Sequence, residues 1–242
     1  MEKSINIFKN IDELSGFFAQ HLKTKVKAIP EGQFFSIALS GGSTPRAVFQ
    51  YLALNYKTQI PWKKILVFWG DERCVPPESE ESNYRMANES LLDQVPIPGS
   101  NIFRIMGEAR PSNELERYAK LVRQHITLVN GIPQFNFIML GLGNDGHTAS
   151  IFPGNLDFFN SEKLFEVAEH PQTKQKRITA TGKLINQALN VAFLVTGESK
   201  AEMVNIILGH KEDWQKLPAS LVHPKDGELI WLLDDKAAFM LK

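Results

Sequence analysis

Short unbroken runs of apolar residues alternate along the chain with longer stretches in which apolar residues recur every three or four positions. The unbroken runs are typical of strands that a sheet buries on both faces, and the spaced pattern is typical of amphipathic helices. The predicted strands are 34–39, 65–69, 135–140, 177–180, 190–195 and 228–233, and the predicted helices are 11–26, 45–54, 84–92, 113–129, 198–208 and 235–241. This alternation predicts an α/β fold, in which a mainly parallel sheet carries helices on both faces.

Local signals predict where two of these helices begin. Pro45 suits the first position of a helix, where its missing N–H is not needed. Asn113 and Glu116 have the spacing of a capping box, which predicts a helix from Asn113 to Val129.

The chain has 242 residues, a length that suits one large α/β domain. Its sequence has no internal repeat, low-complexity stretch or linker, so residues 1–242 are predicted to form a single domain. The loop-rich stretch 153–179 is expected to form a subsidiary lobe of that domain.

Charge and cysteine content narrow the class of protein. Lys and Arg number 27, and so do Asp and Glu, which gives no reason to expect a nucleic acid or an acidic membrane as partner. The single cysteine, Cys74, excludes a disulfide within the chain and fits a reducing compartment. Neither a signal-like segment nor an apolar run of roughly 18 residues is present, so we expect a cytoplasmic protein. For its oligomeric state, both a monomer and a homodimer remain open.

Three polar loops follow buried strands, and they span 40–44, 70–73 and 141–147. In open α/β sheets, ligands bind beyond the carboxyl ends of the strands. The three loops are therefore expected to meet at one ligand-binding edge of the sheet.

The first loop carries Gly41, Gly42, Ser43 and Thr44 ahead of a predicted helix. Glycines allow a close approach of the backbone to an anion, and a helix N-terminus supplies free N–H groups. The loop is neither a Walker loop nor a dinucleotide fingerprint. It is interpreted as a phosphate site, and a plain strand-to-helix turn is the alternative.

The second loop carries Asp71, Glu72 and Arg73. Asp71 could accept a hydrogen bond from a substrate hydroxyl, and Arg73 could bind a phosphate or carboxylate with its fork of donors. A structural salt bridge is the alternative, and it is the interpretation favoured for Glu72.

The third loop places Asp145 two residues before His147. Histidine is the natural general base or acid near neutral pH, and a neighbouring carboxylate can orient it. The histidines at 21, 125, 170, 210 and 223 lack such a setting. The chain has no His-Glu-x-x-His motif or Cys/His cluster, so no required metal is predicted.

Two further basic residues are candidates for anion binding. Arg177 opens a predicted strand, and Lys200 lies in the first turn of a predicted helix, where the helix dipole disfavours a cation. An anionic partner would explain Lys200, and a solvated surface lysine is the alternative.

These segments together resemble the 6-phosphogluconolactonase family over nearly the whole chain. The matching segments are Ser40-Gly41-Gly42-Ser43-Thr44-Pro45, Asp71-Glu72-Arg73-x-Val75, Ser82-Asn83-Tyr84, Gly141-x-Gly143-x-Asp145-Gly146-His147-Thr148-Ala149-Ser150, Phe152-Pro153, Arg177-Ile178-Thr179, Thr196-Gly197-x-x-Lys200, Leu217-Pro218-Ala219-Ser220 and Trp231-x-x-Asp234-x-x-Ala237. The block from Asp145 to Ser150 is the most specific of them.

The resemblance implies a modified Rossmann sheet, shared with glucosamine-6-phosphate deaminases and ribose-5-phosphate isomerases. It implies hydrolysis of 6-phospho-D-glucono-1,5-lactone to 6-phospho-D-gluconate in the oxidative pentose phosphate pathway, without a cofactor. His147 is then the general base and acid, and Asp71 and Asp145 are further catalytic residues. The residues implied to bind the substrate and its phosphate are Gly41, Gly42, Ser43, Thr44, Arg73, Asn83, Arg177 and Lys200.

Two other functions remain open from the sequence. An amino-sugar phosphate deaminase-isomerase resembles the chain at its first and third loops, but there the histidine block leads to an acidic residue. This chain continues instead as Thr148-Ala149-Ser150-Ile151-Phe152-Pro153. A sugar-phosphate-binding protein without catalytic activity is the second alternative.

Overall fold

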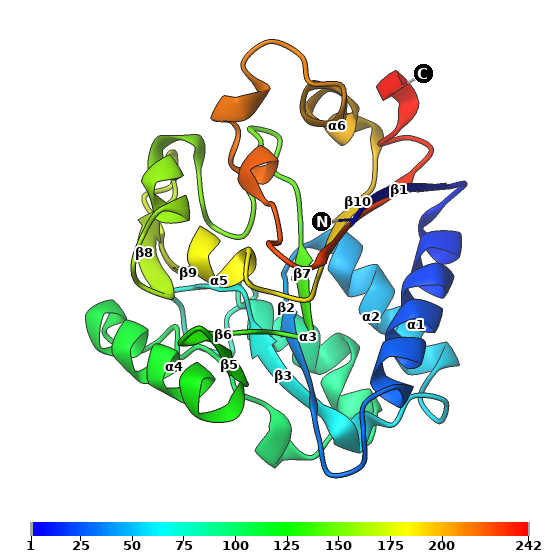
Figure 1. The fold of residues 1–242 in the computed structure, drawn as a ribbon, viewed down its shortest axis with the longest axis vertical. Helices are drawn as coiled ribbons and strands as arrows, with labels where there is room; N and C mark the ends of the chain where they lie inside the picture. The colour runs from blue at the N-terminus through cyan, green and yellow to red at the C-terminus, as the bar shows by residue number, and fades with distance from the viewer. Residues whose placement is uncertain (1, 242) are drawn as a thin grey trace.

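The computed structural model describes residues 2–241, and its centre is a parallel sheet of six strands (Figure 1). These strands span Glu2–Phe8 (β1), Phe35–Leu39 (β2), Ile65–Trp69 (β3), Phe137–Leu140 (β7), Asn190–Val195 (β10) and Glu228–Asp234 (β11). Their order is β1-β11-β10-β7-β2-β3, and every neighbouring pair is parallel. The predicted mainly parallel sheet is confirmed.

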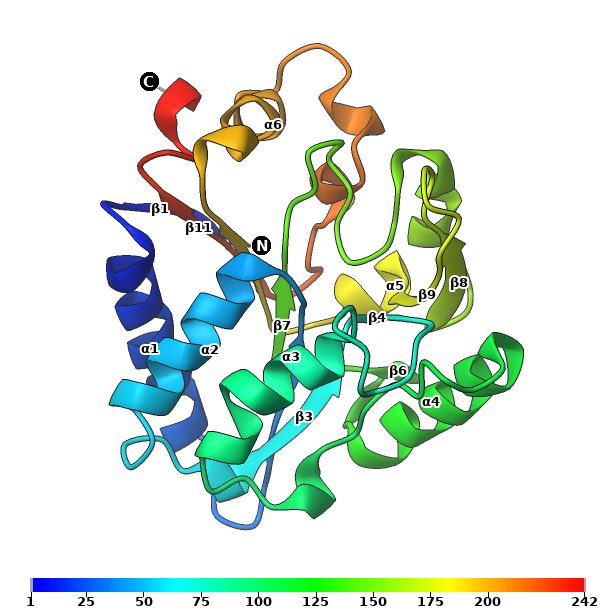
Figure 2. The ribbon, with the colours of Figure 1, turned by 180° about the vertical axis from the view of Figure 1, so that it is seen from behind.

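Helices flank this sheet. They span Ile11–Lys27 (α1), Ser43–Asn55 (α2), Asn83–Ser90 (α3), Pro111–His125 (α4), Gly182–Ile185 (α5) and Ala201–Leu208 (α6). Figure 2 shows α1, α2 and α3 side by side, with α2 packed between the other two. Shorter 3-10 turns span Trp62–Lys64, Leu92–Gln94, Gly99–Asn101, Pro153–Phe159, Glu198–Lys200, Trp214–Lys216, Pro218–Leu221 and Phe239–Leu241.

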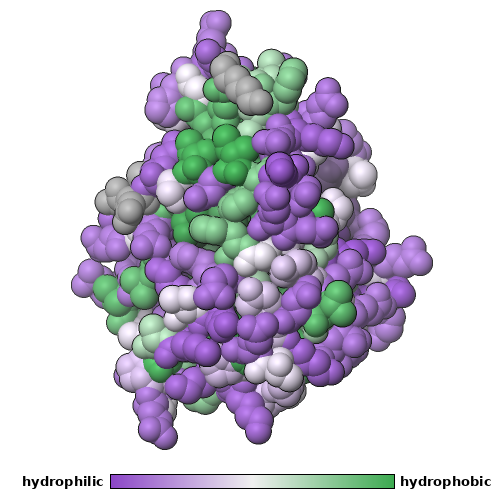
Figure 3. Space-filling model, turned by 90° about the vertical axis from the view of Figure 1, so that its right-hand side faces the viewer, coloured by the Kyte–Doolittle hydropathy of each residue, from purple (hydrophilic) through white to green (hydrophobic). Residues whose placement is uncertain are grey.

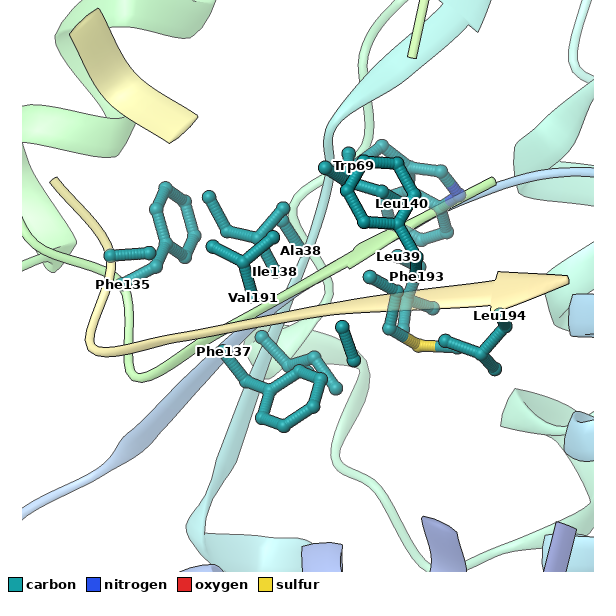
Figure 4. Close-up of a cluster of buried hydrophobic side chains, with 14 of the residues drawn as sticks. Ala38, Leu39, Trp69, Phe135, Phe137, Ile138, Leu140, Val191, Phe193 and Leu194 are labelled. Atoms are coloured by element: carbon teal, nitrogen blue, oxygen red, sulfur yellow. The ribbon is translucent and has the colours of Figure 1, made fainter. Parts of the chain in front are cut away.

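The hydrophobic core lies on both faces of the central strands. Every residue of β2, β3, β7 and β10 is buried. In Figure 4, Phe137 and Ile138 of β7 point to opposite sides of their strand. The ring of Phe193 stacks on that of Trp231, with 4.1 Å between the centroids. Burial on both faces explains why these strands are unbroken apolar runs in the sequence.

A second, antiparallel sheet contains two strands from the stretch 153–179, for which a subsidiary lobe was expected, and one strand from the segment after β3. It consists of Asp71–Arg73 (β4), Lys176–Ala180 (β9) and Phe165–Glu169 (β8), in the order β4-β9-β8. The segment predicted as a loop after β3 is therefore largely a strand, because β9 pairs with it. A two-stranded hairpin of Leu128–Val129 (β5) and Ile132–Pro133 (β6) completes the strands, and α4 packs against β8, β9 and β6.

Apart from 11–26, the predicted helix bounds differ from the structure by two residues or more at one end at least, and three of these helices show the difference most clearly. Pro45 is the third residue of α2, which begins at Ser43. Pro111 occupies the first turn of α4 and fixes its start, so Asn113 lies inside the helix and does not cap it, and the helix ends at His125. The predicted closing helix 235–241 is a turn followed by one 3-10 turn, and the carboxylate of Asp234 accepts the N–H of Ala237 at 2.7 Å.

The edge strand β1 was missed. Its exposed and half-buried residues alternate, so its apolar residues form no unbroken run. Figure 3 shows the side of the molecule that carries α1 and the C-terminal turn, where an apolar area interrupts a mostly hydrophilic surface. The exposed apolar side chains of β1, α1 and the C-terminal turn are Ile5, Ile7, Phe17, Phe239 and Met240.

Candidate active site

A cavity of about 500 Å³ opens at the carboxyl ends of the central strands. All three loops predicted to meet there contribute to its walls. The residues that line it are Ser40, Gly41, Gly42, Asp71, Arg73, Asn83, Gly141, Leu142, Gly143, Asn144, Asp145, His147, Ala149, His170, Gln172, Arg177 and Lys200. Its volume falls in the range that small-molecule sites have.

His147 and Asp145 form a hydrogen-bonded pair on the loop after β7. Nδ1 of His147 lies 2.6 Å from Oδ1 of Asp145, which also accepts the backbone N–H of His147 at 3.1 Å. A Cβ atom on Gly143 would lie 2.1 Å from Nδ1 of His147. A side chain at position 143 would therefore displace the imidazole ring from Asp145, and glycine leaves room for the pair.

The charge of Asp145 determines the state of this pair. Burial opposes ionisation of Asp145, but the hydrogen bond and charge of His147 outweigh it and lower the pKa of Asp145 to about 2. Asp145 is therefore a carboxylate at neutral pH and accepts a hydrogen bond from Nδ1–H of His147. In the neutral imidazole, Nε2 then carries the free lone pair, which suits it to accept a proton.

Asp71 lines the cavity, and hydrogen bonds hold it in place. Its side chain is 5% exposed, and Oδ2 accepts a hydrogen bond of 2.7 Å from the buried hydroxyl of Ser150. Nδ2 of Asn83 donates to the backbone carbonyl of Asp71 at 2.9 Å. Gly41 passes so close to Asn83 that a Cβ atom there would lie 1.8 Å from its Oδ1. Asp71, Asn83 and Gly41 therefore support one another.

Glu72 has a structural role, although not in the salt bridge that was favoured for it. Its carboxylate accepts the backbone N–H groups of Asn83 and Tyr84, each at 2.7 Å, and that of Arg73 at 2.8 Å. Among residues 2–241 it has no ion-pair partner. Burial raises the pKa of Glu72, and these backbone hydrogen bonds oppose the rise. Glu72 therefore anchors the start of α3.

Three cationic side chains line the cavity. Lys200 donates to Oδ1 of Asn144 at 2.6 Å, and Arg73 donates to the backbone carbonyl of Glu81 at 2.5 Å. Within the described part of the chain, Nε of Arg73 and Nε of Arg177 are buried without a hydrogen-bond partner. Burial, followed by the charge of Arg73, lowers the pKa of Arg177, and burial also lowers that of Lys200. Three positive charges around one cavity favour an anionic ligand.

The glycine-rich loop ends at the N-terminus of α2. Gly42 has a φ of 108°, and none of the described side chains caps the first turn of α2. Free N–H groups at a helix N-terminus are suited to bind an anion. Gly41 and Gly42 line the cavity, but Ser43 and Thr44 do not. Ser43 lines an adjoining hollow of about 300 Å³, and the hydroxyl of Thr44 lies 2.7 Å from that of Thr196.

Sequence reasoning missed His170, Gln172 and the role of Asn144 at this cavity. His170 and Gln172 lie on the turn between β8 and β9, which reaches the cavity only because β9 pairs with β4. No motif in the sequence signals that pairing. No contact was predicted for Asn144, but its Oδ1 accepts a hydrogen bond from the ammonium group of Lys200.

Residues 2–241 lack the features of two other classes of protein. They contain no cluster of three or more His, Cys, Asp or Glu side chains placed to hold a metal ion. Within the same range, no helix has both the length and the apolar character needed to cross a membrane.

Several known proteins resemble this chain in sequence. Residues 9–231 match the family model of glucosamine-6-phosphate isomerases/6-phosphogluconolactonase. A 6-phosphogluconolactonase of Haemophilus influenzae is 44% identical over 206 residues, which cover 85% of this chain and 87% of that protein. One from Treponema pallidum is 37% identical over 199 residues, which cover 82% and 81% respectively.

Solved structures show the same similarity. A 6-phosphogluconolactonase from Trypanosoma brucei superposes with a TM-score of 0.88 at 32% identity, over 100% of this chain and 99% of that one. A monomeric glucosamine-6-phosphate deaminase superposes with a TM-score of 0.82 at 22% identity, over 98% of this chain and 99% of that one. At that identity the second likeness shows a shared fold only.

Proposed function

The chain belongs to the family of glucosamine-6-phosphate isomerases and 6-phosphogluconolactonases, and from this premise we propose that it hydrolyses 6-phospho-D-glucono-1,5-lactone to 6-phospho-D-gluconate. The observation that carries the proposal is the His147–Asp145 pair, which faces a cavity lined by Arg73, Arg177 and Lys200. The oxidative pentose phosphate pathway is the proposed setting of the reaction.

The proposed reaction uses His147 first as a base and then as an acid. Nε2 of His147 removes a proton from a water molecule, whose oxygen attacks the carbonyl carbon of the lactone. The tetrahedral intermediate collapses with cleavage of the bond from this carbon to the ring oxygen, which takes the proton back from His147. Asp145 accepts Nδ1–H throughout and stabilises the imidazolium that forms. The carboxylic acid product then ionises and releases one proton.

Binding of the phosphate is assigned to the cationic side of the cavity. Arg73, Arg177 and Lys200 line this side and supply charge-assisted donors. The backbone N–H groups at the start of α2 add donors from Gly42 onward. Holding the phosphate there would place the lactone ring across the cavity, toward His147.

The tetrahedral oxyanion also needs donors. We assign this role to backbone N–H groups of the loop after β7, which surrounds His147. Such preorganised donors are worth more in a water-poor cavity than in solution. The buried Asp71 is proposed to accept a hydrogen bond from the substrate, with Ser150 holding its carboxylate in place.

The experiment that tests the proposal measures acid release from freshly made 6-phosphoglucono-1,5-lactone in weak buffer. We expect the protein to accelerate acid release above the spontaneous rate, in proportion to its concentration. A rate equal to that of the lactone alone would overturn the proposal. Incubation with glucosamine 6-phosphate is the matched assay for the deaminase alternative, and we expect no ammonia from it.

A further inference from the structure

His170 is presented to the cavity by the turn that connects β8 to β9. Its backbone N–H donates to the carbonyl of Gln175 at 2.9 Å, and its carbonyl accepts the N–H of Lys174 at 3.0 Å. These two hydrogen bonds close the hairpin and fix the main chain of His170. Because β9 also pairs with β4, the hairpin stands beside the strand that carries Asp71 and Arg73 (Figure 2).

The ring of Phe152 packs against His170 and also against two proposed site residues, His147 and Arg177. The ring of His170 meets the ring of Phe152 edge-on, with 5.2 Å between the centroids. His147 packs on the same ring at 4.8 Å, and the guanidinium of Arg177 lies 5.7 Å from its centroid. Phe152 is 1% exposed, so it is a fixed support for all three groups.

The hydrogen bonds of the His170 ring determine which nitrogen carries its proton. Nδ1 lies 3.3 Å from the backbone nitrogen of Gln172 and 3.2 Å from that of Thr173, and both N–H groups donate to it. Burial, followed by the charges of Arg177 and His147, lowers the pKa of His170. The ring is therefore neutral near pH 7, and its proton lies on Nε2. Nε2 has no hydrogen-bond partner within the described chain, which leaves one unused neutral donor at the cavity.

We propose that His170 contacts the sugar ring of the substrate, with its Nε2–H donating a hydrogen bond to a ring hydroxyl. The proposal rests on the proposed function, because it takes the phosphorylated lactone as the ligand. A neutral donor suits a hydroxyl oxygen, whereas the phosphate is bound better by the three cations. His170 packs on the same Phe152 ring as Arg177 and His147, which places it near both the proposed phosphate site and the proposed base. The hydroxyl-bearing part of the substrate would lie there.

Two substitutions separate this contact from a structural role. His170→Phe keeps a ring against Phe152 and removes the donor. His170→Gln removes the ring and keeps an N–H donor at similar reach. His223→Phe is the matched control, because His223 is exposed and is not among the residues that line the cavity. Each variant is assayed for kcat and KM with the lactone, and for binding of 6-phosphogluconate and of inorganic phosphate by calorimetry.

The contact predicts a loss of sugar binding alone. His170→Phe should raise KM, and the Kd of 6-phosphogluconate, by about 3- to 10-fold, the range for one neutral hydrogen bond. Its kcat should change by less than about twofold, because the contact is made in both ground and transition state. The Kd of inorganic phosphate should not change, and His170→Gln should recover most of the loss.

Three results would overturn the proposal. They are an unchanged KM in His170→Phe, equal losses in His170→Phe and His170→Gln, or an equal loss of phosphate binding in His170→Phe. Failure of the proposed function would look different. The wild-type protein would then show no acid release from the lactone, while the binding of 6-phosphogluconate would still report on His170.

Discussion

Replacing Asp145 with Asn tests whether the carboxylate of Asp145 holds His147 in the tautomer that can act as a general base. The carboxylate of Asp145 lies 2.6 Å from Nδ1 of His147 and is ionised at neutral pH, since its pKa is lowered to about 2. The amide of Asn is neutral and can present either an acceptor or a donor to Nδ1. If it presents the donor, the proton of the imidazole moves to Nε2, and His147 loses its function as a base.

The expected loss follows from the strength of that hydrogen bond. A hydrogen bond to a charged group contributes about 1.5–3 kcal/mol. Because the imidazolium is formed only as the water is deprotonated, the loss should appear in kcat, as a drop of roughly 10- to 150-fold. KM should change little.

The assay is acid release from 6-phosphoglucono-1,5-lactone over a range of substrate concentrations. Asp213→Asn is the matched control, since Asp213 is exposed, lies outside the cavity and forms an ion pair with Lys216. We expect this control to match the wild-type protein. A kcat of Asp145→Asn within about twofold of the wild-type value would refute the reasoning.

Three further predictions follow from particular contacts. Gly143→Ala should lower kcat by at least about 10-fold, because the new Cβ would lie 2.1 Å from Nδ1 of His147. Gly154→Ala is the control, since no atom lies within 4 Å of a Cβ at that position, and its kcat should not change. Equal activities of the two variants would contradict this prediction. Glu72→Gln should lower the free energy of unfolding, measured in urea, by about 1–3 kcal/mol, because the amide NH₂ cannot accept hydrogen bonds from the N–H groups at the start of α3. An unchanged urea midpoint would count against this prediction. The pKa of Asp145 is lower in the folded protein, about 2, than in the unfolded chain, about 3.9. The ionised carboxylate therefore stabilises the fold above about pH 3.9, and this stabilisation is lost as the pH falls toward about 2. The difference in unfolding free energy between wild type and Asp145→Asn should therefore shrink over that range, and a constant difference would refute the assignment.

The central strands could be predicted from the sequence because they are buried on both faces. Residues 65–69 and 190–195 were predicted with the bounds that the structure has, and α1 with bounds within one residue. The edge strand β1 was missed, because one of its faces is largely exposed and its residues alternate. Short strands such as β4 and β8 form because of their partners in the second sheet, and their own sequences carry no comparable pattern.

The site could be predicted as far as single loops carry its chemistry. His147 and Asp145 lie two residues apart, so their pairing is a local property of one glycine-rich loop. His170 depends on the pairing of β8 with β9 and of β9 with β4, and no local motif contains that information. The hydroxyl of Thr44 was expected to face the ligand, but it pairs with Thr196, from the end of a strand that lies far away in the sequence.

The most direct test of the central claim is the rate of acid release from 6-phosphoglucono-1,5-lactone by the His147→Ala variant, measured beside the wild-type protein at saturating substrate. General acid–base catalysis of this kind contributes roughly 10²–10⁴-fold, so we expect kcat to fall by that factor while 6-phosphogluconate still binds. A variant that turns over the lactone at nearly the wild-type rate would contradict the assignment of His147 as the base.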